Sequence, residues 1–254
     1  MSRALLYDAT LCIGCQQCEQ ACAAQNKLPY DDGVAKEQRT SDHKYTYVAK
    51  LTTRGEEHYM RRMCMQCNDP TCVSVCPVGA LEKTKDGPVT YDESKCMGCR
   101  YCMVACPFGV PKYEWTKAIP RVRKCVMCPD RLAAGKQTAC AEACPTGATL
   151  FGNRNALLQT AHQRINDNPL QYYNHVYGEN EVGGTSMMFL SSANLPFEQF
   201  GFPVHYGTQA LPPLTANVLN RVPGIVGVGW AVLGGIWWIT NRRDEVAQAE
   251  EKKP

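Results

Sequence analysis

Residues 96–107 read Cys96-Met-Gly-Cys99-Arg-Tyr-Cys102-Met-Val-Ala-Cys106-Pro107. Three cysteines stand three residues apart, a fourth follows after four residues, and a proline comes next. Thiolates at this spacing can converge from one short loop onto one metal centre. A fourth cysteine that begins a helix would point away from the loop and bind another centre, so this run predicts a second one elsewhere in the chain.

The 16 cysteines of this 254-residue chain fall into four such groups, and none lies outside them. Disulfide-rich secreted proteins are usually much shorter and spread their cysteines over loops, so the grouping favours metal. The run C-x2-C-x2-C-x3-C-P binds [4Fe–4S] clusters in bacterial ferredoxins, and no histidine lies within a group, which excludes a Rieske centre. We therefore predict four [4Fe–4S] clusters, with these metal ligands: Cys12, Cys15, Cys18, Cys22, Cys64, Cys67, Cys72, Cys76, Cys96, Cys99, Cys102, Cys106, Cys125, Cys128, Cys140 and Cys144.

The groups differ from one another in ways that predict local structure. Ala23 replaces the proline of the first group, and eleven residues, 129–139, separate the middle cysteines of the fourth group, as a solvated loop or a docking surface. Residues 80–83 and 88–91 flank an Asp-Gly pair and predict a hairpin. Strands are expected at 5–8 and 45–51, a turn at 31–33, a helix at 155–166 and a linker or extended arm at 196–213. The glycine two residues after each Cys-Pro would leave room beside a cluster.

Residues 222–240 carry no charge and are long enough for a transmembrane helix, although a buried core helix is the alternative. Arg242 and Arg243 follow at once and only Arg221 precedes closely, so the positive-inside rule places the cysteine domain in the periplasm. No signal peptide or twin-arginine pair opens the sequence. This favours a cytoplasmic protein or one exported folded with a partner that carries the signal.

Catalysis by this chain is not expected. A net charge of +3 is too balanced to indicate nucleic-acid binding. There is no G-x-G-x-x-G after a strand, no P-loop and no Ser/His/Asp candidate set. Clusters held entirely by cysteine have no open coordination position, so the chain is predicted to carry electrons without binding a substrate.

Residues 5–152 resemble the four-cluster iron–sulfur (beta) subunits of membrane-bound, molybdopterin- or nickel-dependent respiratory enzymes. The apolar C-terminal stretch and the segment Tyr177-Gly-Glu-Asn-Glu-Val-Gly-Gly-Thr-Ser-Met-Met-Phe-Leu190 are similar to formate dehydrogenase beta subunits and to the ferredoxin subunit of hydrogenase-2-type complexes. Asp130-Arg131 in the long gap and the missing twin-arginine pair favour formate dehydrogenase. The sequence motif Tyr-Gly-Glu-x-Glu favours the ferredoxin subunit of hydrogenase-2-type complexes.

This resemblance implies an α+β fold of tandem pseudo-repeated bacterial-type 2×[4Fe–4S] ferredoxin units with a C-terminal transmembrane helix. It divides the chain into a double ferredoxin domain at 1–152, an extension and linker at 153–221, a membrane helix at 222–240 and a charged tail at 241–254. It also implies four ligand sets, of which spacing alone gives only the pairing of the two inner groups. The sets are Cys12, Cys15, Cys18 with Cys144 (set A); Cys125, Cys128, Cys140 with Cys22 (set B); Cys96, Cys99, Cys102 with Cys76 (set C); and Cys64, Cys67, Cys72 with Cys106 (set D).

The function that the resemblance implies is electron transfer at the inner membrane. The chain would pass electrons between a periplasmic catalytic subunit and a quinone-reactive membrane subunit, either a cytochrome b or a heme-free protein. Molybdopterin formate dehydrogenase is the favoured catalytic partner, with [NiFe] hydrogenase or another molybdopterin reductase as alternatives. A soluble polyferredoxin and a zinc structural protein are the rival interpretations.

Overall fold

A computed structural model describes residues 2–53 and 55–251 of the chain. It consists of two units, Met1–Leu211 and Pro212–Pro254. Strands and helices are mixed along the first unit, as an α+β protein requires, whereas the second unit is helical. The duplication of two ferredoxin units stays a prediction.

A three-stranded sheet with the order β8-β1-β9 lies at the centre of the first unit. Its strands are β1 (Arg3–Asp8), β8 (Thr149–Asn153) and β9 (Met187–Leu190). β1 pairs antiparallel with β8 and parallel with β9. Because successive side chains alternate between faces, Leu5 and Tyr7 enter one core cluster while Ala4 and Leu6 enter another. The strand expected at 5–8 is confirmed and begins two residues earlier.

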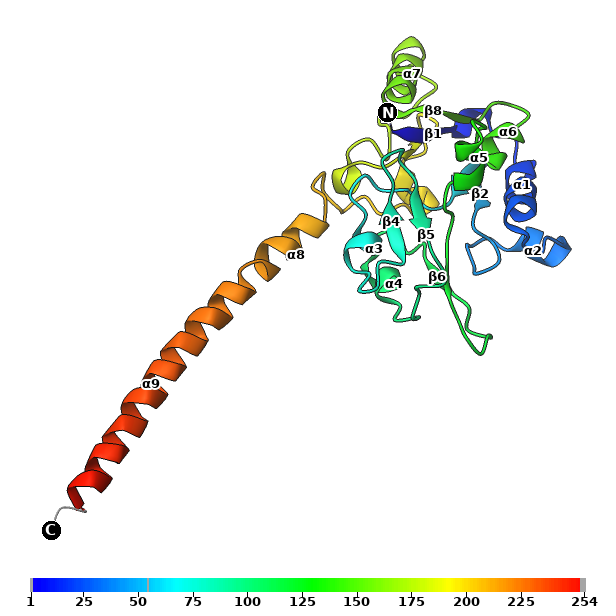
Figure 1. Cartoon of the computed structure of the whole chain (residues 1–254). Coiled ribbons are helices and arrows are strands. Elements are labelled where there is room, and N and C mark those ends of the chain that lie inside the picture. The colour runs from blue at the N-terminus through cyan, green and yellow to red at the C-terminus, as the bar shows by residue number, and fades with distance from the viewer. Residues whose placement is uncertain (1, 54, 252–254) are drawn as a thin grey trace. The chain divides into compact units, whose positions relative to one another are not determined.

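Helix α7 (Arg154–Asp167) covers one face of this sheet, and Figure 1 shows it above β1 and β8. Its buried side chains Leu157, Ala161 and Ile165 recur every four residues, which is the spacing of one helix face. Asn153 caps the helix by accepting a hydrogen bond from the Asn155 amide at 3.0 Å. The helix expected at 155–166 is therefore confirmed.

Three antiparallel hairpins complete the strands. They are β2 (Tyr47–Thr53) with β3 (Glu56–Arg62), β4 (Leu81–Lys83) with β5 (Val89–Tyr91), and β6 (Lys112–Tyr113) with β7 (Val122–Arg123). The hairpin at 80–91 and the strand near 45–51 are confirmed. Short helices accompany the cysteine groups: α1 (Gln17–Asn26), α3 (Thr71–Ser74), α4 (Tyr101–Ala105), α5 (Pro129–Ala133) and α6 (Ala139–Glu142).

The turn expected at 31–33 is instead the start of helix α2 (Asp32–Lys36). Asp31 is the N-cap, and its carboxylate accepts a hydrogen bond from the Val34 amide at 2.9 Å. Aspartate favours turns and helix N-caps for the same reason, since its short side chain bonds a nearby amide. The local sequence was compatible with both structures.

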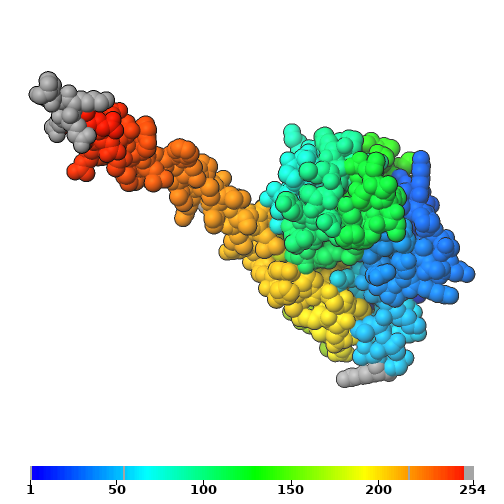
Figure 2. Space-filling view, turned by 90° about the horizontal axis from the view of Figure 1, so that it is seen from below, coloured from blue at the N-terminus to red at the C-terminus, as the bar shows by residue number. Residues whose placement is uncertain are grey.

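The prediction of a linker or extended arm at 196–213 is wrong for the first part of this range. Phe197, Phe200 and Phe202 are buried in the main core cluster, where Phe202 packs against Phe189 with ring centroids 5.0 Å apart. Figure 2 shows the yellow residues of this region lying directly against the blue and cyan parts of the first unit. Proline and glycine indicate loops, but the interleaved phenylalanines bury enough apolar area to hold this one in place.

The second unit contains α8 (Pro212–Leu219) and α9 (Val222–Glu251). Residues 222–248 form a helix long and apolar enough to cross a membrane, and none of its apolar window is buried within the chain. The helix does not stop at residue 240: the expected charged tail continues it to Glu251. Arg242 and Glu245 form an ion pair one turn apart, at 3.2 Å, which favours continued helix. Residues 252–254 lie outside the described part.

Replacing Phe197 by alanine should lower the free energy of unfolding by about 3–5 kcal/mol, because it empties a core position. Phe197 is 1% exposed. Unfolding in urea, followed by far-ultraviolet circular dichroism without oxygen, would measure the change. Leu170→Ala is the control, because Leu170 is 95% exposed and its loss should change the free energy by less than about 0.5 kcal/mol. Equal values for the two variants would contradict burial of the 196–213 region.

Candidate metal centres

Four cysteines from three separate parts of the sequence line one hollow in the first unit. Cys22 comes from α1, Cys125 and Cys128 precede α5, and Cys140 lies on α6. Arg61 also lines this hollow. Helices α1 and α6 pack against each other, which brings the fourth cysteine of the first group to the fourth group. These are the four cysteines of set B.

A second hollow is lined by the four cysteines of set C together with Tyr91 and Val122. Cys102 lies on α4, and Cys76 follows α3. The β4–β5 hairpin joins the two groups, and its Leu81 and Val89 are buried in the same small core cluster as Cys102. The hairpin thus returns the chain so that the second and third groups face each other.

The thiols of the other two sets lie close enough to affect one another. Burial raises the pKa of Cys67, and the neighbouring thiols of Cys64, Cys106 and Cys72 raise it further. Burial also raises the pKa of Cys12, as do the thiols of Cys144 and Cys15. The structure therefore brings together members of sets A and D as well, and their binding of clusters stays a prediction.

The β1–β8 ladder explains why the first and last groups meet. β1 leads into Cys12, while β8 leaves the Cys144 loop. Tyr7 is paired with Thr149, and the Asp8 amide donates to the Ala148 carbonyl at 2.8 Å. This register fixes the two cysteine loops side by side, although 132 positions separate Cys12 from Cys144 in the sequence.

The donor set fits an iron–sulfur cluster. All 16 cysteines are free thiols. Backbone amides donate to several sulfurs: Gly14 to Cys12 at 3.5 Å, Met127 to Cys125 at 3.4 Å and Ala80 to Cys76 at 3.3 Å. Successive amides of this kind form concave sites for anions, including iron–sulfur clusters. Among the described residues no group of three or more His, Cys, Asp or Glu side chains is placed to hold a single metal ion.

The four cysteine loops share a left-handed residue two positions after their first cysteine. The φ angles are 69° at Gly14, 53° at Gln66, 73° at Gly98 and 63° at Met127. A left-handed residue turns the peptide amide inward, toward the preceding cysteine. Only the first and third loops use glycine there, and a Cβ on Gly98 would lie 3.1 Å from the Tyr113 hydroxyl.

The glycines after Cys-Pro were expected to make room beside a cluster. A Cβ built at Gly79, Gly109 or Gly147 meets no protein atom within 4 Å, so crowding by the chain does not explain them. Their φ angles of 60° to 67° explain why glycine stands here, because other residues rarely adopt this left-handed conformation.

Sequence reasoning missed a Tyr-Asp pair five residues before the first cysteine of groups one and three. Asp8 accepts hydrogen bonds from the Thr10 amide and hydroxyl at 3.0 and 2.6 Å, and Asp92 accepts the same two from Ser94 at 3.0 and 2.6 Å. The Tyr91 hydroxyl is buried without a hydrogen-bond partner among the described residues. Burial and the neighbouring Cys96 thiol raise the pKa of Tyr91. The repeated sequence motif Tyr-Asp-x-Thr/Ser could have identified both pairs.

Residues 177–190, which the sequence had identified, form backbone hydrogen bonds with the loop of the second cysteine group. The Ser186 and Met187 amides donate to the Gln66 and Met65 carbonyls at 3.0 and 3.1 Å. Glu181 closes the segment by accepting from the Gly178 amide at 2.7 Å and pairing with His175 Nε2 at 2.6 Å. Its role in this structure is to position a cysteine loop.

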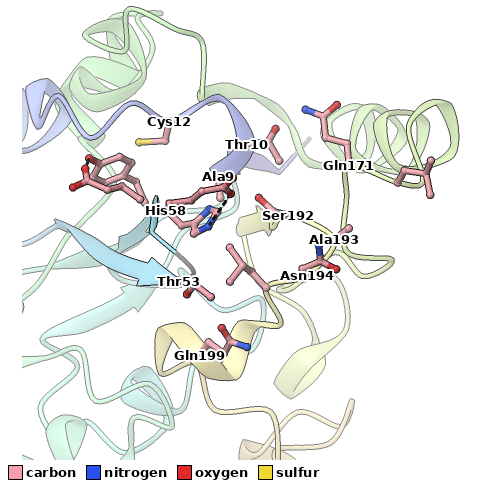
Figure 3. A pocket seen from close by; sticks show the side chains of 15 residues that line it. Ala9, Thr10, Cys12, Thr53, His58, Gln171, Ser192, Ala193, Asn194 and Gln199 are labelled. Atoms are coloured by element: carbon pink, nitrogen blue, oxygen red, sulfur yellow. Dashed lines mark hydrogen bonds and ion pairs between the residues drawn. The ribbon is translucent and has the colours of Figure 1, made fainter.

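A larger hollow of about 790 Å³ opens beside Cys12. Figure 3 shows its polar lining, which includes Thr53, His58, Gln171 and Asn194. His58 lies 3.9 Å from the Glu56 carboxylate, so it has an acidic neighbour at the surface. Within this lining the Tyr59 hydroxyl donates to the Glu57 carboxylate. The hollow gives solvent, or a partner, access to the loop of set A.

Comparisons with known proteins give a consistent picture. A family profile described as a 4Fe-4S dicluster domain matches residues 55–154. A protein of Nitratidesulfovibrio vulgaris is 44% identical over 98% of this chain and 70% of its own length. The hydrogenase-2 operon protein HybA of Escherichia coli O157:H7 is 37% identical over 80% of this chain and 73% of its own. The nitrate-inducible formate dehydrogenase iron-sulfur subunit of Escherichia coli K12 is 35% identical over 79% of this chain and 72% of its own.

Removal of Cys22 and removal of Cys140 should abolish the same cluster signal in electron paramagnetic resonance (EPR) spectra, because the two thiols line one hollow. Cys18→Ala is the matched control: it lies on the same helix as Cys22 but belongs to set A. Each variant should lose about four iron atoms per chain, since a cube held by three thiolates is labile. If Cys18→Ala and Cys22→Ala removed the same signal, the grouping would be wrong.

The His175–Glu181 pair should stabilise the fold in a pH-dependent way. The hydrogen bond that His175 donates to the Glu181 carboxylate raises the pKa of His175 above 6.5. Burial opposes ionisation of Glu181, but the hydrogen bonds from His175 and the backbone lower its pKa below 4.5. The contribution of His175 is complete below pH 6.5 and is lost as the pH rises through its raised pKa, while that of Glu181 is lost in acid.

The free energy of unfolding of wild type minus that of Glu181→Gln should therefore fall as the pH rises above 6.5 and through the raised pKa of His175. Urea unfolding at several pH values would measure it. Glu82→Gln, which removes an exposed carboxylate on β4, should give a difference that does not change with pH. A constant difference for Glu181→Gln would show that the ion pair is not formed.

Proposed function

The chain belongs to the family of [4Fe–4S] iron–sulfur subunits that includes HybA and the formate dehydrogenase iron-sulfur subunits, and on that premise we propose that it is an electron-transfer subunit with four [4Fe–4S] clusters. It would connect a periplasmic catalytic subunit to a quinone-reactive subunit in the inner membrane. The observation that supports this best is the gathering of all four cysteine groups from distant segments into shared sites.

In this proposal sets A, B, C and D hold one cluster each. A bound [4Fe–4S] cluster supplies reversible one-electron chemistry. The chain supplies the thiolates, the amide donors that face them and the buried surroundings that exclude water. Because all four positions of each site would be cysteine, no position is left for a substrate, and the chain would have no catalytic activity of its own.

The apolar surface around set C supports a protein partner. Met97, Tyr101, Val104 and Trp115 are exposed, and Val104 is the most exposed of them at 88%. Three of the four lie within 97–104, which contains the cysteine loop and α4. Exposed apolar residues gathered in one region mark interaction sites more often than scattered ones do. A partner that covers them would come close to the set C site.

Formate dehydrogenase is the favoured catalytic partner, because Asp130-Arg131 in the long gap of the fourth group resembles the formate dehydrogenase subunits. A [NiFe] hydrogenase is the second candidate, because HybA matches at 37% identity and the sequence of residues 177–190 resembles that of hydrogenase subunits. Another molybdopterin reductase is the third.

Helix α9 would anchor the chain in the inner membrane. Its apolar residues are exposed in the chain, and the arginines at 242 and 243 favour a cytoplasmic C-terminus with the clusters in the periplasm. The sequence from residue 212 to 254 contains no histidine, so this helix cannot supply an imidazole ligand to heme. The membrane partner would be a cytochrome b or a heme-free quinone protein.

Anaerobic purification in mild detergent should yield a brown complex with about sixteen cluster iron atoms per copy of this chain, beyond the iron of its partners. Its visible absorption should bleach with dithionite, and a molybdopterin or nickel subunit should copurify. The isolated chain should oxidise neither formate nor hydrogen. A colourless protein with four zinc ions, or release from washed membranes without detergent, would instead favour the zinc protein or the soluble polyferredoxin.

A further inference from the structure

Arg61 on β3 is the most buried cation near the predicted clusters. Its side chain is fully enclosed, with 1% of the residue exposed. Nε donates to the Thr46 hydroxyl at 2.9 Å, and Nη1 lies 3.4 Å from the Thr149 hydroxyl. The guanidinium also lines the hollow that Cys22, Cys125, Cys128 and Cys140 share. The two threonines therefore fix a positive charge at the wall of the set B site.

This charge has no carboxylate partner among the described residues. Lys44, which is similarly buried, pairs with Glu19 at 2.8 Å, whereas Arg61 forms no ion pair. A buried charge that is satisfied only by neutral hydroxyls is costly. Burial opposes the charge on Arg61, but the sulfurs of Cys140, Cys18 and Cys22 raise its pKa, so anionic sulfur is its natural counter-charge.

These sulfurs belong to two different sets. Cys140 and Cys22 are in set B, and Cys18 is in set A. Cys18 and Cys22 lie one turn apart on α1, so one face of this helix presents a ligand of each set toward the guanidinium. Positive charge and hydrogen bonds near a cluster favour its reduced form, and in a buried site salt screens that interaction little.

We propose that Arg61 tunes the reduction potentials of two clusters. Its guanidinium, held by Thr46 and Thr149 between sets A and B, raises the reduction potentials of the clusters at these two sites. The proposal rests on the proposed function, because it requires clusters at sets A and B. An electron that passes through the chain would then be more stable on these two clusters than it would be without Arg61.

The test is an EPR-monitored redox titration of the detergent-solubilised complex, without oxygen and at fixed pH. Arg61→Met removes the charge with little change of shape, and Arg61→Lys keeps a charge. Arg62→Met is the matched control: Arg62 is the next residue on β3, bonds the Phe200 carbonyl at 3.0 Å and stacks 4.0 Å over the Phe202 ring. Each reduction adds one electron from dithionite, and no bond in the chain forms or breaks.

In Arg61→Met, two of the four clusters of this chain should become at least tenfold harder to reduce, which is about 59 mV for a one-electron couple. The other two should stay unchanged, Arg61→Lys should recover most of the shift, and Arg62→Met should leave all four unchanged. Unshifted potentials in an iron-complete Arg61→Met protein would overturn the proposal. So would a shift of the same size in Arg62→Met.

Iron content separates failure of this inference from failure of the proposed function. If the wild-type chain has no iron–sulfur signals, the proposed function fails. If the wild type has them but Arg61→Met and Arg61→Gln both lose the iron of sets A and B, Arg61 is a structural cation and the redox role is overturned.

Discussion

A sulfur anion can stay inside a protein only if positive charge or hydrogen-bond donors replace the water that it has lost. Much of this structure follows from that constraint. Burial raises the pKa of Cys18 and Cys125 to about 12, so these thiols would stay protonated at neutral pH without such compensation. Metal coordination requires the deprotonated form. The same interior therefore disfavours free thiolates and accepts them once cationic iron is bound.

The backbone and one buried side chain meet the same need. Left-handed residues such as Gly14 and Met127 turn their amides toward the first sulfur of their loops. Arg61 contributes a full positive charge beside the set B cysteines, and Thr46 and Thr149 hold it in place. These groups come from elements distant in sequence, so the fold has to be complete before the sites have their final electrostatics.

Sequence reasoning worked best where the pattern is local. The cysteine spacing, the hairpin at 80–91 and helix α7 follow from residues that lie within a few turns of one another. It failed where a local signal had two meanings. Asp31 can begin a turn or cap a helix, and phenylalanines among prolines and glycines can belong to a loop that is nevertheless buried. Tertiary packing decided both cases, because only it supplies the surface against which Phe197 and Phe202 pack.

The sequence by itself indicated the chemistry: sixteen cysteines in four groups, with no histidine among them, predict sulfur ligation, and an uncharged stretch of membrane-spanning length follows. It could not determine which distant cysteines meet. That was decided by the β1–β8 ladder and the packing of α1 on α6, whose contacts join residues more than a hundred positions apart. Ligand spacing acts over a few residues along the chain, whereas a shared site depends on how whole elements pack. The placement of Arg61 between two of these sites likewise exists only in the folded chain.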